Sequence, residues 1–308
     1  MRISATVITF NEERDLDACL RSLDWCDEIV VVDSGSQDRT QEIAQSHGAR
    51  VVVRPFEGFS AQKNFAAQEA RGDWIFSVDA DEVVGPELRD EIKTLLGSGP
   101  KEVGFYVPRR NVWLETEIRH GGWYPDHTLR LYRRDAGRWE GHSHEKVVVT
   151  GSTRVLRGAL VHRTIRDLHD HLRKGLLSAV LELKEAKANK LRLYGWFPVS
   201  VLWMCLRDFW SGSKSELGIR AIYKARVKNR VAVRWLLPLY PAFRFAYMYI
   251  LRGGFLDGNV GFWLAYNSAI VESMKCAKFW EHYVYHRGTT PAGEASLEDT
   301  RTLYRSMS

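Results

Sequence analysis

The chain has 308 residues, of which 45% are hydrophobic and 12% aromatic, with a formal net charge of +6 and only four cysteines. This composition is typical of a folded protein and excludes disordered, collagen-like and disulfide-rich classes. The charge is uneven, since residues 1–100 carry 10 Lys and Arg against 19 Asp and Glu, whereas residues 151–253 carry 20 against 6. The sequence therefore predicts an acidic site for a cation or nucleotide in the first part and a surface for an anionic partner behind it.

The first hundred residues alternate strand-like and helix-like patterns. The predicted strands are 3–10, 28–32, 51–53 and 74–78, and the predicted helices are 13–23, 38–47, 59–70 and 87–96. Strands that alternate with short helices indicate an α/β fold with a mostly parallel sheet and flanking helices. Polar segments at 9–13, 33–36 and 79–82 follow three of the strands, and functional loops in such sheets lie at the carboxyl ends of strands.

Beyond residue 100 the pattern changes. Short apolar runs at 104–108, 129–133 and 146–149 predict an antiparallel extension, and a helical, basic and aromatic pattern runs from 167 to about 285. We expect three regions, which are a catalytic domain at 1–165, a helical membrane-associating segment at 166–285 and a loose tail at 286–308. Within the first, 1–85 would bind the nucleotide and 100–165 would form the acceptor side.

Two stretches are apolar enough to be compared with membrane spans. They are 196–210 and 231–251, and both are interrupted by charged residues, the second also by prolines. A spanning helix needs about 20 largely apolar residues. We therefore expect these stretches to lie on a membrane rather than to cross it.

The segment Asp79-Ala80-Asp81-Glu82 places three carboxylates in four residues at the end of an apolar strand. Carboxylates this close repel one another unless a cation lies among them, and hard oxygen ligands suit Mg²⁺ or Mn²⁺. The alternative is an acidic turn in which Glu82 caps a helix. Residues 33–38 similarly allow either a nucleotide-binding loop or a turn with an N-cap.

These segments, together with Thr9-Phe10-Asn11-Glu12-Glu13, resemble the family 2 glycosyltransferases, which have the GT-A fold. The resemblance is carried by ITFNEERDLDACLRSL, DEIVVVDSGSQDRT and GDWIFSVDADE. Within that family the chain is similar to the bacterial lipopolysaccharide-core β-1,4-glucosyltransferase type, through FSAQKN, WYPDHTLRLYR and HEKV. The resemblance implies a metal-dependent inverting hexosyltransferase that uses Mg²⁺ or Mn²⁺, a UDP-sugar donor and a lipid-linked saccharide acceptor.

The resemblance also implies roles for individual residues near the donor. Those expected around the uridine are Thr9, Asn11, Glu12 and Asp33. Lys63 is expected near the ribose or diphosphate, Asp79 at the ribose or the metal, and Asp81 as a metal ligand. His162 is expected either as the last metal ligand or as a hydrogen-bonded structural histidine.

An inverting transfer also needs a carboxylate that takes the proton of the acceptor hydroxyl. Many family members have a Glu-Asp pair after the antiparallel extension, whereas this chain has Ser143-His144-Glu145-Lys146. We expect Glu145 to be the base, with Asp126 as second choice. A surface ion pair with Lys146 is the alternative for Glu145.

The last set of expectations concerns partners. Tryptophan and tyrosine mixed with arginine and lysine at 191–251 predict an interfacial helix hairpin on an anionic membrane, or alternatively a packed helical subdomain. With no paired cysteine motif and no signal-peptide pattern, we expect a cytoplasmic protein, peripheral on the inner membrane, with no nucleic-acid partner. Two other functions stay open: a sugar nucleotidyltransferase, and a non-catalytic protein that binds a membrane surface or nucleic acid.

Overall fold

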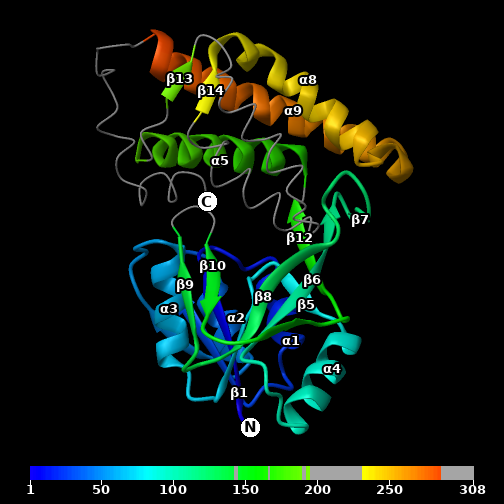
Figure 1. Cartoon of the computed structure of the whole chain (residues 1–308). Helices are drawn as coiled ribbons and strands as arrows, with labels where there is room; N and C mark the ends of the chain where they lie inside the picture. The colour runs from blue at the N-terminus through cyan, green and yellow to red at the C-terminus, as the bar shows by residue number, and fades with distance from the viewer. Residues whose placement is uncertain (142–144, 166, 189–191, 195–230, 286–308) are drawn as a thin grey trace. The chain divides into compact units, whose positions relative to one another are not determined.

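The computed structural model describes residues 1–141, 145–165, 167–188, 192–194 and 231–285 (Figure 1). The chain divides into two compact units, with the boundary between Asp167 and Leu168. Each unit is described by itself. The expected tail at 286–308 and the stretch 195–230, which contains the whole expected apolar segment 196–210, lie outside the described residues.

The first unit begins with three βα repeats. Its strands are β1 (Ile3–Thr9), β2 (Glu28–Asp33), β3 (Arg50–Val53) and β4 (Trp74–Ser77), and its helices are α1 (Leu16–Arg21), α2 (Thr40–Ser46) and α3 (Phe59–Glu69). The four strands are parallel in the order β3-β2-β1-β4. In this register Thr9 pairs with Asp33, so the loops that follow β1 and β2 begin side by side.

Alternation along the strands explains how the sheet is covered on both faces. Val31 and Phe76 belong to a core cluster with residues of α1 and α4 (Pro86–Gly97), such as Leu20 and Leu88. Their neighbours in sequence, Val30 and Val32 of β2 and Ile75 of β4, belong to a second cluster with Ala66 and Ala70 at α3. Because successive side chains of a strand point to opposite faces, apolar residues at every position produce a doubly covered sheet.

The sheet continues past β4 with antiparallel and parallel pairings. The further strands of the first unit are β5 (Glu82–Val84), β6 (Gly104–Trp113), β7 (Thr116–Glu117), β8 (Asp126–Arg133), β9 (Gly137–Glu140), β10 (Lys146–Val149), β11 (Thr153–Val155) and β12 (Leu160–Ile165). The order is β4-β8-β6-β12-β5, while β9 and β10 form a separate two-stranded sheet. The predicted mostly parallel α/β fold with flanking helices is confirmed, and β6 and β8 are longer than predicted.

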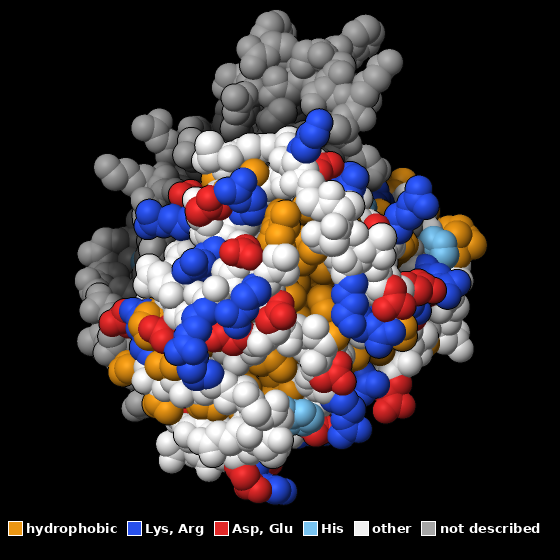
Figure 2. All heavy atoms as spheres, turned by 90° about the horizontal axis from the view of Figure 1, so that it is seen from below, with side chains coloured by type: hydrophobic (Ala, Val, Ile, Leu, Met, Phe, Trp, Pro, Cys, Tyr) orange, Lys and Arg blue, Asp and Glu red, His pale blue; other side chains and the backbone are white. Residues whose placement is uncertain are grey.

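One surface of the first unit lies at the end of the sheet where β1 begins. Figure 2 shows basic and acidic side chains interspersed there around apolar ones, the usual composition of a solvated surface. The acidic and polar loops singled out in the sequence follow the opposite, carboxyl ends of β1, β2 and β4.

The second unit is largely helical, as predicted. Its elements are α5 (Leu168–Ala188), β13 (Arg192–Tyr194), β14 (Val231–Val233), η2 (Arg234–Leu239), α8 (Tyr240–Ala246), η3 (Tyr247–Leu251), η4 (Gly254–Asp257), α9 (Gly258–Trp280) and η5 (Glu281–Tyr285). The short parallel pair β13–β14 was not predicted. No helix among the described residues is both long and apolar enough to cross a membrane.

Elements α8 and α9 form a tight helical hairpin. A Cβ atom at Gly261 of α9 would collide with the carbonyl oxygen of Gly254 in η4, so α9 and the short segment before it approach backbone to backbone. Between them Phe245 stacks on Tyr249 with 5.3 Å between ring centroids, and Phe262 meets both rings edge-on at 5.6 Å. This aromatic packing fixes the hairpin without burying the outer side chains of α8.

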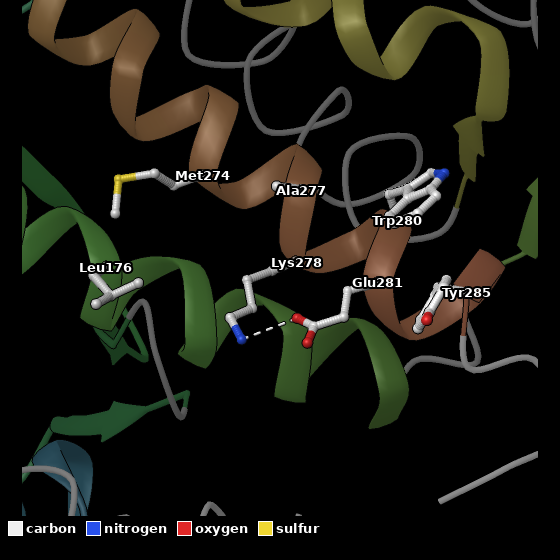
Figure 3. A pocket seen from close by; sticks show the side chains of 7 residues that line it. All are labelled: Leu176, Met274, Ala277, Lys278, Trp280, Glu281 and Tyr285. Atoms are coloured by element: carbon white, nitrogen blue, oxygen red, sulfur yellow. Dashed lines mark hydrogen bonds and ion pairs between the residues drawn. The ribbon is translucent and has the colours of Figure 1, made fainter. Parts of the chain in front are cut away.

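An open apolar pocket of about 540 Å³ lies between α5 and the end of α9 (Figure 3). It is lined by Leu176, Met274, Ala277, Lys278, Trp280, Glu281 and Tyr285. Trp280 stacks on Tyr285, and the ammonium of Lys278 lies 3.0 Å from the Glu281 carboxylate. The pocket belongs entirely to the second unit.

Candidate active site

Asp33, at the end of β2, organises the loop that follows it. The side chain is fully buried and accepts five hydrogen bonds, from the Thr9 hydroxyl at 2.9 Å, from the amides of Gly35 and Ser36, from the Ser36 hydroxyl and from the Gln41 side chain at 2.8 Å. Gly35 has φ of +90°, a conformation that favours glycine. Both carboxylate oxygens of Asp33 are therefore used in shaping this turn.

The loop after β1 is bonded to the loop after β2. The Asn11 amide donates to the Ser36 hydroxyl at 2.9 Å, and the Asn11 side-chain oxygen accepts from the Gln37 amide at 2.9 Å. The backbone amide of Glu12 donates to the Thr40 hydroxyl at 2.7 Å. Asn11 has φ of +55°, which asparagine tolerates better than most residues. The structure thus gathers Thr9, Asn11, Glu12 and Asp33 into one hydrogen-bonded polar corner, formed by the loops after β1 and β2.

Lys63 of α3 lies between two carboxylates. Its ammonium is 2.9 Å from Asp79 Oδ1 and 3.1 Å from Glu145 Oε1, and it lies 4.3 Å from the centre of the Trp139 ring. Only 4% of Lys63 is exposed, so this charge is buried and needs both partners. The structure therefore brings together three predicted site residues that are far apart in the sequence.

Asp79 has a second cation on its other side. Arg130 of β8 lies 2.5 Å from Asp79 Oδ2 and 2.6 Å from Glu82 Oε1, and Glu82 is fully buried. Burial raises the pKa of Asp79, but Arg130 and Lys63 outweigh it and hold the pKa well below the usual range. Both oxygens of Asp79 are thus engaged with cations of the protein itself.

Glu82 was expected as part of an acidic turn, and its role is to anchor the loop. Its second oxygen accepts from the Asp79 amide at 2.9 Å, and Arg109 of β6 lies 3.4 Å from its first. Arg109 also contacts Asp126 at 2.5 Å. Removing one partner of a buried ion pair typically costs about 3–5 kcal/mol, so these contacts hold the acidic loop in place.

Asp81 lies beside His162 of β12, with 3.4 Å between Asp81 Oδ2 and His162 Nε2. The other ring nitrogen of His162 is 2.8 Å from the side-chain oxygen of Asn111, on the neighbouring strand β6. Burial lowers the pKa of His162, but the charge of Asp81 outweighs it and the pKa is raised. His162 lies within β12, not in a loop.

The contacts show which predicted residues meet. Glu145, Lys63 and Asp79 form one chain of ion pairs, which Arg130, Glu82 and Arg109 extend to Asp126. Asp81 and His162 form a separate pair. Across the described residues, no three His, Cys, Asp or Glu side chains gather as a ready-made metal cage, so Asp79 does not complete one with that pair.

Sequence reasoning missed three residues of this site, Arg109, Arg130 and Asn111. Arg130 gave one signal in the sequence, because it interrupts the apolar run of β8. In the structure this arginine is only 2% exposed. A cation inside an apolar strand indicates a buried ion pair, since an unpaired charge there would be too costly. Asn111 and Arg109 gave no such signal.

The structure thus has a mixed sheet with polar and acidic loops at the carboxyl ends of its parallel strands, the place where open α/β sheets bind their ligands. Residues 4–155 match the model of glycosyl transferase family 2. The chain carries a domain of that family, and the family expected from the sequence is confirmed.

Curated relatives agree with this assignment. The chain is 36% identical over 168 residues to the lipopolysaccharide core biosynthesis glycosyltransferase LpsC of Rhizobium meliloti (strain 1021). This alignment covers 52% of this chain and 62% of that protein. It is 45% identical over 98 residues to an uncharacterized glycosyltransferase of Rickettsia bellii (strain RML369-C), 32% of this chain and 33% of that one. The matches thus span less than two thirds of these relatives.

Among solved structures, the chain is similar to glucosyl-3-phosphoglycerate synthase from Mycobacterium tuberculosis, crystallised with Mn²⁺, UDP and phosphoglyceric acid. The identity is 19% and the TM-score 0.40, over 53% of this chain and 70% of that one.

Proposed function

We propose that the protein is an inverting glycosyltransferase that moves a sugar, glucose in the first instance, from a UDP-sugar to a hydroxyl of a lipid-linked saccharide such as lipopolysaccharide core. One observation carries the proposal. The Asp81–His162 pair and the Lys63–Asp79–Glu145 cluster both include carboxylates of the loop after β4, at the carboxyl end of the parallel strands.

The donor side rests on the polar corner and the acidic loop. In the proposal Thr9, Asn11 and Glu12 contact the uridine, while Asp33 acts by holding the turn from 33 to 36 in shape. Asp79 contacts the ribose in the proposal, and the ammonium of Lys63, 2.9 Å from Asp79, holds that carboxylate in place. These groups bind and orient the donor for attack on its anomeric carbon.

Asp81 and His162 fit a divalent cation because one oxygen and one imidazole nitrogen face each other across 3.4 Å. Two protein ligands are enough for Mg²⁺ or Mn²⁺, which are usually bound by one or two carboxylates together with substrate phosphates. Such a cation neutralises negative charge on the departing diphosphate when it is bound. His162 favours Mn²⁺ over Mg²⁺, since Mg²⁺ prefers oxygen ligands.

Glu145 is the proposed general base. Its carboxylate takes the proton of the acceptor hydroxyl as that oxygen bonds to the anomeric carbon and the bond to the diphosphate breaks. The ammonium of Lys63, 3.1 Å away, orients this carboxylate. Asp126, the second candidate, is held by Arg109 at 2.5 Å and is about 38% exposed.

The test is a donor screen. The purified protein is incubated with UDP-sugars and a deacylated core oligosaccharide, with Mn²⁺, with Mg²⁺ or with EDTA, and UDP release is measured. Metal-dependent UDP release that requires both substrates supports the proposal. Release of pyrophosphate from UTP and a sugar phosphate would instead show a nucleotidyltransferase, and absence of both reactions would leave a binding protein.

Lys63 offers a prediction about how the base is held. Lys63→Met removes the charge that orients Glu145, so we expect kcat to fall about 10²-fold with donor KM changed less than about threefold. Lys146→Met, at the neighbouring exposed lysine, should leave both constants unchanged. Steady-state kinetics decide, and an effect mainly on donor KM would assign Lys63 to diphosphate binding instead.

The proposal includes an anionic membrane surface as partner, with the protein peripheral on the cytoplasmic face of the inner membrane. Several large apolar side chains of the α8–α9 hairpin, with η3 counted as its connection, are exposed, including Phe243 at 60%, Ile250 at 60% and Leu251 at 76%. Arg244 and Arg252 lie among them in the sequence. Exposed apolar clusters with flanking cations are typical of interfacial binding.

We therefore predict that replacing Phe243, Ile250 and Leu251 together by serine lowers binding to anionic vesicles at least tenfold, because each buried apolar side chain contributes roughly 1.5–3 kcal/mol. A matched triple variant, serine at the exposed valines 53, 148 and 155 of the first unit, should bind as the wild type does. Co-sedimentation at low and high salt is the measurement. Equal binding by both variants would remove the hairpin from the membrane contact.

A further inference from the structure

Asn111 is a buried amide with both ends in use. It lies on β6, is 5% exposed, and pairs in register with His162 of the neighbouring strand β12. Its side-chain nitrogen donates to the carbonyl oxygen of Trp123 at 2.8 Å, and its side-chain oxygen lies 2.8 Å from His162 Nδ1.

These two contacts determine the orientation of the amide. The Trp123 carbonyl can only accept a hydrogen bond, so the NH₂ group of Asn111 must face it and the oxygen must face His162. A carbonyl oxygen needs a donor, and His162 Nδ1 must therefore carry a proton. The remaining ring nitrogen, Nε2, then points at Asp81 Oδ2, 3.4 Å away.

We propose that Asn111 is a positioning residue that holds His162 with Nδ1 protonated and Nε2 directed at a divalent cation shared with Asp81. The inference rests on the proposed metal site. Histidines that bind metals usually donate their other N–H to a carbonyl or carboxylate, and loss of such a partner typically costs 10–100-fold in metal affinity. Asn111 is in turn fixed by the backbone at Trp123, in the turn that precedes Asp126.

A purely structural role for Asn111 makes different predictions. A buried amide that only satisfies its own hydrogen bonds contributes to stability through those bonds and to nothing else. Its loss would lower the melting temperature and would change metal binding only as far as the fold is disturbed. Separating the two roles therefore needs a metal-binding readout that does not depend on turnover.

The experiment is a double-mutant cycle on Mn²⁺ affinity with Asn111→Leu and His162→Ala. The Mn²⁺ dissociation constant is measured by EPR titration in the presence of UDP, with UDP alone as blank, and thermal melting is recorded without metal. We expect Asn111→Leu to weaken Mn²⁺ binding 10–100-fold and to have no further effect when His162 is already alanine. Asn111→Asp, which keeps the acceptor but loses the donor to Trp123, should retain most of the affinity.

The outcomes are distinguishable. Wild-type Mn²⁺ affinity in Asn111→Leu, or equal losses with and without His162, would overturn the positioning role while leaving the proposed function intact. Weaker binding of UDP by Asn111→Leu in the absence of metal would also overturn it, because the effect would then not act through the cation. Absence of UDP-dependent Mn²⁺ binding in the wild type would overturn this inference and the metal site of the proposed function together.

Discussion

Replacing Asp81 by alanine is expected to lower the transfer rate by at least about 10³-fold and to leave the melting temperature nearly unchanged. Asp81 is a half-buried loop carboxylate that belongs to neither core cluster of the first unit, so it contributes little to packing. In the proposed site it supplies the oxygen ligand of the cation that neutralises the leaving diphosphate. Turnover under saturating donor and Mn²⁺, measured beside thermal melting, tests both halves of this expectation.

Two controls make the Asp81 result interpretable. Asp90→Ala removes an exposed carboxylate of α4, 64% exposed and paired with Arg89, and should change neither activity nor stability. Asp79→Ala removes a carboxylate that contacts two buried cations and should lower stability as well as activity. Near-normal turnover of Asp81→Ala at saturating metal would remove Asp81 from the mechanism.

The βα repeats of the first unit could be predicted from sequence because their signals are local. The strand 74–78 shows a short apolar run followed at once by the acidic loop, and the observed β4 ends within one residue of that prediction. The pairing beyond β4 could not be predicted in the same way. β5 pairs with β12, more than 70 residues later in the chain, and no local pattern identifies a partner at that distance.

In the candidate site, too, some contacts could be predicted from local sequence patterns and others could not. Loops that follow neighbouring parallel strands must lie close together, so the meeting of Thr9 with Asp33 could be expected. The pairing of Lys63 with Glu145 joins residues 82 apart and depends on how β9 and β10 fold over α3. Asn111 was missed because an asparagine in a strand becomes informative only when its two partners are known.

Arg130 shows why the first carboxylate of the acidic loop was the hardest to interpret. From sequence, Asp81 is expected to bind the cation, and Asp79 to contact either the ribose or the cation. In the structure Asp79 Oδ2 lies against Arg130, a cation supplied by a strand some 50 residues later, while Asp81 lies against His162. The different partners give the two carboxylates different roles, and only the folded chain supplies those partners.

Glu145→Gln is expected to lower kcat by about 10² or more with little change in donor KM. Glutamine keeps the size of the side chain and can still contact Lys63, but it cannot take a proton from the acceptor hydroxyl. A loss confined to kcat is the result expected when an interaction is made only in the transition state. Glu140→Gln, at an exposed carboxylate of β9, is the matched control and should keep wild-type kinetics.

The competing assignment is tested in the same series with Asp126→Asn. Asp126 contacts Arg109, which in turn contacts the buried Glu82. Replacing the Asp126 carboxylate by the asparagine amide should therefore lower activity modestly, through this chain of contacts. An active Glu145→Gln together with an inactive Asp126→Asn would move the base to Asp126.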